Sequence, residues 1–213
     1  MKTKIFVIHG GSTYKTKKDF LERLQNLKVS IEERIRWSDD YLTKKLGTDF
    51  EIIRPRMPLR ENAKYQEWKI YFDKFVPFLS KNDILIGSSL GGIFLAKYLS
   101  ENKLPKKMLS VYLIAPPFDN SLSIPGKDLV GGFKLSADLS LIEKNTKNIN
   151  LLFSKDDQIV PIAHAEKYRV KLPKAKLVIF ESKNGHFLVP EFPEIVKMIK
   201  GEVKINNEFG KTK

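Results

Sequence analysis

Residues 83–99 read DILIGSSLGGIFLAKYL, and this stretch decides the fold. Residues 83–87 are a short, largely apolar run, typical of a strand buried on both faces of a parallel sheet. Residues 92–99 favour a helix. Between them lies a G-x-S-x-G pentapeptide with Ser89 at its centre. A strand, a tight glycine turn and a helix in this order predict a nucleophile elbow, in which the turn lifts the serine hydroxyl clear of the sheet.

The pentapeptide alone is short enough to occur by chance, so a glycine-rich turn without chemistry is the alternative interpretation. Ser88 offers a neighbouring hydroxyl, but the glycines two positions before and two positions after centre on Ser89. The N-terminus of the helix that follows favours negative charge developing at this point. We therefore expect Ser89 to be the reacting residue.

Runs of strand length alternate with longer stretches of helical period along the whole chain. Strands are expected at 4–9, 49–54, 83–87, 109–115, 149–154 and 176–180. Helices are expected within 20–35, 63–79, 90–100, 162–172 and 191–200. This alternation predicts an α/β fold, with a mostly parallel sheet of about six strands flanked by helices on both faces.

Residues 14–34 fit the alternation poorly and lengthen the first crossover. The segment carries an apolar stripe at helical spacing, formed by Phe20, Leu24, Leu27 and Ile31. Ser30 followed by Glu33 resembles a capping box, so the stretch contains one helix or two. The stripe is expected to pack against the flank of the sheet, to cover a pocket as a lid, or to face a second subunit.

A single domain is expected over residues 1–201, with a helical insertion at 14–34 and a basic C-terminal tail at 202–213. Residues 116–139 are rich in Gly, Pro and Ser. Long excursions at the carboxyl ends of strands are where α/β enzymes place lids, so this segment is expected to be a cap or lid loop.

The composition is that of an ordinary globular protein, with 42% hydrophobic and 30% charged residues among 213. Cysteine is absent, which excludes disulfides and thiolate chemistry. No apolar run has the length of a membrane span and no signal peptide is evident, so a soluble, cytoplasmic protein is expected. The net charge of +13 would suit an anionic partner, but the lysines are scattered, and nucleic-acid binding is not expected.

A serine hydroxyl needs a base to take its proton. His186 follows the sixth expected strand, and Ser89 follows the third, so both are expected at the carboxyl edge of the sheet. An acid that orients the histidine is expected after the fifth strand, where Asp156 and Asp157 are adjacent. The residues alone favour neither aspartate, and one of them is expected to be a turn or cap residue.

The tetrahedral intermediate of such a reaction needs two backbone donors. One is expected to be the N–H of Leu90, directly after the nucleophile. The other is expected from the loop after the first strand, with Gly11 preferred and Ser12 next. His9 in the same loop is expected to be structural. A phosphate-binding loop is the rival interpretation, but its glycine and lysine pattern is missing.

With these residues in place, the sequence resembles the small serine hydrolases grouped with retinoblastoma-binding protein nine, or YdeN-like proteins, a compact branch of the α/β-hydrolase superfamily. The resemblance extends over most of the chain, in order. It is carried by His9-Gly10, Met57-Pro58, Ala63, Glu67-Trp68, Gly87 to Gly91, Asp156-Asp157 with Pro161, and Gly185-His186-Phe187.

The resemblance implies an α/β-hydrolase fold in its compact form, whose sheet starts at the strand that is third in larger relatives. It also implies a catalytic triad of Ser89, Asp157 and His186, with Asp157 rather than Asp156 as the acid. Arg36-Trp37 looks like the family's aromatic turn, which makes the segment from Tyr14 to about Arg34 an addition.

The expected activity is hydrolysis of carboxylic esters with small or medium acyl groups, through an acyl-enzyme intermediate. Amidase, peptidase or thioesterase activity with the same triad is the alternative, as is a non-catalytic binding module on a hydrolase scaffold. No metal or organic cofactor is expected. The partner is a small-molecule ester, and the chain is expected to be a monomer or homodimer.

Overall fold

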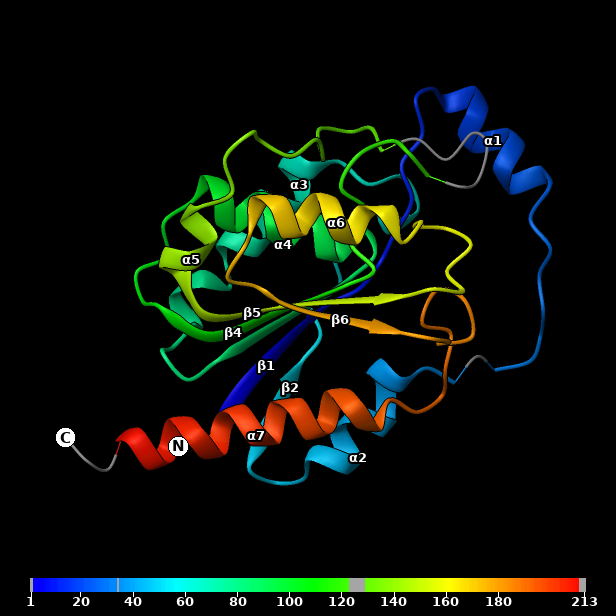
Figure 1. Ribbon diagram of the computed structural model, residues 1–213. Helices are drawn as coiled ribbons and strands as arrows, with labels where there is room; N and C mark the ends of the chain where they lie inside the picture. Colours follow the sequence, from blue (N-terminus) through cyan, green and yellow to red (C-terminus); the bar gives the residue numbers. More distant parts are fainter. Residues whose placement is uncertain (1, 34, 123–128, 211–213) are drawn as a thin grey trace.

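The structure, a computed structural model, describes residues 2–33, 35–122 and 129–210 (Figure 1). Its six strands form one sheet in the order β2-β1-β3-β4-β5-β6, and every neighbouring pair is parallel. Each expected strand is confirmed to within a few residues at its ends. The strands are β1 (Thr3–Ile8), β2 (Phe50–Ile53), β3 (Ile84–Ser88), β4 (Met108–Ile114), β5 (Thr146–Ser154) and β6 (Lys176–Phe180).

Helices cover both faces of the sheet, as the alternation predicts. One layer holds α3 to α6 and the other holds α2 and α7, while α1 stands apart beside the ends toward which the strand arrows point (Figure 1). The helices are α1 (Lys17–Gln25), α2 (Leu42–Leu46), α3 (Tyr65–Asp73), α4 (Leu90–Glu101), α5 (Leu141–Asn145), α6 (Ala163–Lys171) and α7 (Pro193–Gly210).

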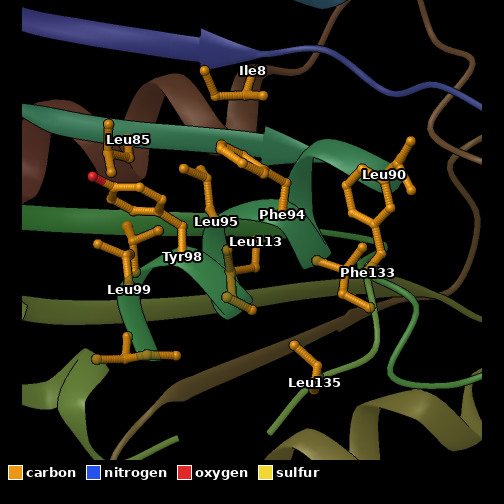
Figure 2. Close-up of a cluster of buried hydrophobic side chains, with 14 of the residues drawn as sticks. Ile8, Leu85, Leu90, Phe94, Leu95, Tyr98, Leu99, Leu113, Phe133 and Leu135 are labelled. Carbon is orange, nitrogen blue, oxygen red and sulfur yellow. The ribbon is translucent and has the colours of Figure 1, made fainter. Parts of the chain in front are cut away.

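Among the described helices, α4 has the most buried residues. A single residue, Ser89, lies between the end of β3 and the start of α4. Its side chains Phe94, Leu95 and Leu99 are fully buried. They lie among side chains from β1, β3 and β4, including Leu85 and Leu113 (Figure 2). Each such burial contributes about 1.5–3 kcal/mol, so the turn between β3 and α4 is held by a rigid core.

The described residues 14–33 of the expected helical insertion at 14–34 differ from the expectation. The capping box of α1 is formed by Thr16 and Asp19, not by Ser30 and Glu33, and the helix ends at Gln25. Residues 26–33 form no helix. The Ser30 hydroxyl accepts a hydrogen bond from the backbone N–H of Glu32 instead of capping a helix. No residue of α1 is buried, and its local cap determines where the helix begins.

The expected packing of this stripe against the flank of the sheet is wrong. Leu24 and Leu27 are 46% and 44% exposed, and Ile31 is fully exposed. Amphipathic spacing identifies which side chains share a helix face, but it does not predict which surface that face packs against.

The expected tail at 202–213 is also different, because α7 continues to Gly210. Glu202, placed in the tail by its polar surroundings, accepts hydrogen bonds from Ser110 on β4 and from Asn150 on β5. The body of the domain therefore extends beyond residue 201.

Candidate active site

Ser89 is the single residue that joins β3 to α4, and its backbone is strained. Its φ is 54° and its ψ is −119°, a conformation that side-chain-bearing residues rarely adopt. The Ser89 N–H donates to the carbonyl of Ile114 at the end of β4, over 2.8 Å. This bond and the buried helix behind it hold the turn sharply bent, as the elbow motif predicts.

The two glycines of the pentapeptide are required by close backbone contacts. A Cβ at Gly87 would lie 2.4 Å from the carbonyl oxygen of Gly91. A Cβ at Gly91 would lie 2.4 Å from the carbonyl oxygen of Ile8 on β1. Any side chain at either position would force the turn or the neighbouring strand to move.

His186 and Asp157 lie together at the same edge of the sheet. Nδ1 of His186 is 2.6 Å from Oδ2 of Asp157, and the aspartate side chain is 1% exposed while the histidine side chain is 13% exposed. The other carboxylate oxygen of Asp157 accepts from the backbone N–H groups of Ile159 and Val160. Because Nδ1 faces a carboxylate it carries the proton, which leaves Nε2 as the acceptor.

Asp156 does not contact His186 but organises the loop that carries it. Its carboxylate accepts from the backbone N–H groups of Gly185, at 2.9 Å, and Lys183, at 3.1 Å. It also accepts from the hydroxyls of Ser182 and Ser154. The Gly185 N–H, followed by the two hydroxyls, holds the pKa of Asp156 well below its usual range. The structure thus brings Asp157, and not its neighbour, to the histidine.

Ser89 and His186 both line a cavity of about 720 Å³ at the carboxyl edge of the sheet. The loop after β1 forms one wall of the cavity, and residues from the crossover connections form the rest of its lining. Other described residues of the lining include Gly10, Gly11, Trp37, Leu90, Leu122, Leu129, Ile159 and Leu188. A cavity of this size accommodates a small organic molecule next to the serine.

The two expected oxyanion donors, Gly11 and Leu90, both line this cavity. A Cβ at Gly11 would lie 2.5 Å from the carbonyl oxygen of Arg60 and 3.0 Å from the Leu90 side chain, so only glycine fits. The second choice, Ser12, donates its N–H to the Arg60 carbonyl over 2.8 Å. That bond commits the Ser12 N–H and favours Gly11 as the donor.

His9 has the structural contacts that were expected of it. Its Nε2 accepts the backbone N–H of Met57 at 3.0 Å, and its Nδ1 donates to the carbonyl of Gly10 at 2.7 Å. These two bonds fix one neutral tautomer, and burial lowers the pKa of His9 below its usual range. The imidazole therefore joins the glycine loop to the chain after β2.

His164 on α6 is fully buried and forms the same kind of hydrogen bonds as His9, a role that the sequence did not indicate. His164 on α6 accepts the Phe118 N–H through Nδ1 and donates to the Ser121 carbonyl through Nε2, each at 2.8 Å. Burial lowers its pKa as well. It holds the start of the 116–139 segment, whose described residues Leu122 and Leu129 line the cavity; residues 123–128 of this expected lid lie outside the described residues.

The part of the chain that the structure describes contains no group of three or more His, Cys, Asp or Glu side chains that could hold a metal ion. No helix in the same residues is long and apolar enough to cross a membrane.

No family model matches the sequence, and no curated protein sequence matches it significantly. Solved structures do match. The ydeN gene product of Bacillus subtilis superposes with a TM-score of 0.74 at 19% identity, over 95% of this chain and 100% of that one. A YdeN-like hydrolase of Pectobacterium atrosepticum gives 0.64 at 14% identity, over 96% and 92%. Est1E of Butyrivibrio proteoclasticus gives 0.57 at 13% identity, over 94% and 86%. The chain therefore has the α/β-hydrolase fold, in a compact form with six parallel strands.

Proposed function

We propose that this protein is a serine hydrolase that cleaves carboxylic esters of small or medium acyl groups. The observation that carries the proposal is the 2.6 Å contact between His186 and Asp157 at a cavity that Ser89 also lines. Ser89 is the nucleophile, His186 the general base and Asp157 the residue that orients the histidine.

In the first half of the proposed reaction, Nε2 of His186 accepts the Ser89 proton as the serine oxygen attacks the ester carbonyl. The oxyanion that forms is stabilised by the N–H groups of Gly11 and Leu90. Asp157 stabilises the imidazolium. The intermediate collapses as the carbon–oxygen bond to the leaving alcohol breaks, and His186 returns its proton to that alcohol.

In the second half, water attacks the acyl-serine ester and gives its proton to His186. The second tetrahedral intermediate releases the carboxylic acid and the proton returns to Ser89. No redox step occurs in this sequence. Every proton removed by the histidine is returned by it, so the enzyme is regenerated unchanged.

Several structural relatives support an ester as the substrate. A lipase-esterase related protein of Clostridium acetobutylicum and the esterase Pf2001 of Pyrococcus furiosus give TM-scores of 0.52 and 0.53, with identities of 16% and 15%. Amides and thioesters react through the same intermediates and are the alternative substrates. A binding module is disfavoured, because it would have no need of the strained backbone at Ser89.

The proposal is tested by measuring hydrolysis of 4-nitrophenyl esters with acyl chains of two to eight carbons. We expect Ser89→Ala to reduce kcat by about 10⁴-fold or more, since the nucleophile is lost. Ser88→Ala is the matched control, one residue away, and keeps the wild-type rate. Equal rates for Ser89→Ala and the wild type would overturn the proposal.

A pH profile tests the histidine in the same assay. Protonated His186 cannot accept the serine proton, so kcat/KM rises from acid to neutral pH. A flat profile over this range would rule out a histidine base.

A further inference from the structure

The arginines of this chain are concentrated in the cavity. The sequence has seven arginines and 31 lysines, which together are its 38 basic residues. Four arginines line the cavity, whereas no lysine is among its described lining residues. The four are Arg36, Arg54, Arg56 and Arg60. A lysine-rich composition explains the positive charge of the chain as a whole. It does not explain why the basic residues of the cavity are arginines, because it predicts lysines there as well.

Two of these arginines are engaged within the protein. The guanidinium of Arg54 donates to the carbonyls of Ser38 and Asp39, at 2.9 and 2.6 Å, and to the Thr43 hydroxyl. It thereby holds the turn that follows Arg36. Nε of Arg60 lies 3.1 Å from the carboxylate of Glu61.

Arg36 and Arg56 differ from Arg54 and Arg60. Among the residues that the structure describes, neither side chain forms a hydrogen bond or an ion pair. Their backbones are nevertheless fixed, because each is next to a buried residue. Buried Trp37 follows Arg36 and donates its N–H to the Val189 carbonyl, and buried Pro55 precedes Arg56.

The charges of the cavity are unbalanced. Asp39 and Glu61 are the acidic residues of the described lining, against four arginines. A guanidinium stays charged at all physiological pH values, and its planar fork binds carboxylate or phosphate oxygens through two parallel hydrogen bonds. An excess of such groups beside a nucleophile favours a substrate with negative charge.

We propose that the substrate is an anionic ester, whose carboxylate or phosphate group is bound by Arg36 and Arg56 while its ester carbonyl faces Ser89. This inference rests on the proposed function and specifies its substrate class.

The test compares three 4-nitrophenyl esters with acyl chains of similar length. The valerate ester is neutral, the glutarate half-ester ends in a carboxylate, and the 4-phosphonobutanoate ester ends in a phosphonate. We expect kcat/KM for at least one anionic ester to exceed that for valerate by about tenfold or more, the effect of hydrogen bonds to a charged group. About 0.5 M NaCl is expected to reduce this preference.

The double variant Arg36→Gln with Arg56→Gln is expected to bring the ratio of anionic to neutral ester close to one. Arg36→Lys with Arg56→Lys retains the charge without the fork and is expected to give an intermediate ratio. Arg169→Gln is the matched control, because Arg169 lies on α6, pairs with Glu166 and does not line the cavity. It keeps the wild-type ratio.

A wild-type ratio of one or less, or a ratio that the Gln variants leave unchanged, would overturn the inference. Calorimetry with Ser89→Ala separates it from the proposed function, because binding needs no turnover. The glutarate half-ester is expected to bind Ser89→Ala about tenfold more tightly than it binds the protein that also carries both Gln changes. If the half-ester binds both proteins equally, the anion site is overturned, even if the wild type hydrolyses esters. If it binds Ser89→Ala more tightly, the anion site is supported, even if the wild type hydrolyses no ester.

Discussion

Oδ2 of Asp157 lies 2.6 Å from Nδ1 of His186, although the two residues follow different strands and are 29 positions apart. The adjacent carboxylate of Asp156 is directed to the backbone of the loop that carries the histidine. Two neighbouring residues of one type thus support His186 in different ways, one by direct contact and one by holding its loop.

The different contacts of Asp157 and Asp156 predict that replacing each aspartate by asparagine has a different effect. Asp157→Asn is expected to lower kcat by up to about 10⁴-fold, because the amide no longer stabilises the imidazolium or its tautomer. Asp156→Asn is expected to lower kcat much less, but to reduce the free energy of unfolding by about 1–3 kcal/mol through its lost hydrogen bonds. Ester kinetics and urea denaturation on both variants check this. A larger loss of kcat at Asp156 would reverse the assignment.

The strained backbone at Ser89 predicts an unusual effect on stability. Ser89→Gly is expected to increase the free energy of unfolding by about 1 kcal/mol, because glycine adopts a positive φ without cost. Ser89→Ala removes the same hydroxyl but keeps the strain, so it is the matched control. Urea denaturation of both variants measures the difference. Equal stability of the glycine and alanine variants would show that the turn is not strained.

The two neutral histidines, His9 half-buried and His164 buried, predict that stability falls in mild acid. The folded pKa of His9 and that of His164 are lower than in an unfolded chain, so the unfolded state binds protons first as the pH falls. Their contribution to stability is complete above the ordinary histidine pKa of about 6.5 and declines below it. Asp156, with its lowered pKa, loses its contribution only below about pH 4.

Urea denaturation at pH 7.5, 6.5 and 5.5 is expected to show this decline. His164→Gln is expected to be less stable at pH 7.5 but to lose less stability between pH 7.5 and 5.5. A free energy of unfolding that rises toward pH 5.5 would contradict the lowered pKa values of His9 and His164.

The exposed stripe through Leu24, Leu27 and Ile31 predicts tolerance to polar substitution. Leu24→Ser with Leu27→Ser is expected to leave the melting temperature nearly unchanged, because both side chains are already almost half exposed. If the segment closes over the cavity as a lid, the same variant changes the ranking of esters by chain length. Thermal unfolding and the ester series measure the two effects. A loss of several kcal/mol would instead indicate buried packing.

The sequence predicts much of the fold because its signals are periodic and local. All six strands and the parallel sheet follow from the alternation of apolar runs with helical stretches, and the turn at Ser89 follows from its glycines. Because the strands are parallel, Ser89 after β3 and His186 after β6 lie at the same edge of the sheet.

Other features depend on contacts that no local pattern encodes. The residues alone could not separate Asp156 from Asp157, because the difference lies in the direction of two identical side chains. The stripe through Leu24 does not pack against the sheet, because its spacing identifies a shared helix face but not the surface that the face contacts. Glu202 was assigned to a tail because its hydrogen-bond partners, Ser110 and Asn150, are distant in sequence.

The central claim, that Ser89 is an activated nucleophile, is tested most directly by reaction with a fluorophosphonate probe. The probe forms a covalent bond to an activated serine, and peptide mapping then identifies the residue. We predict a single adduct on the peptide that contains Ser89, present in the wild type and in Ser88→Ala and absent in Ser89→Ala. An unlabelled wild type, or an adduct on another residue, would contradict the account.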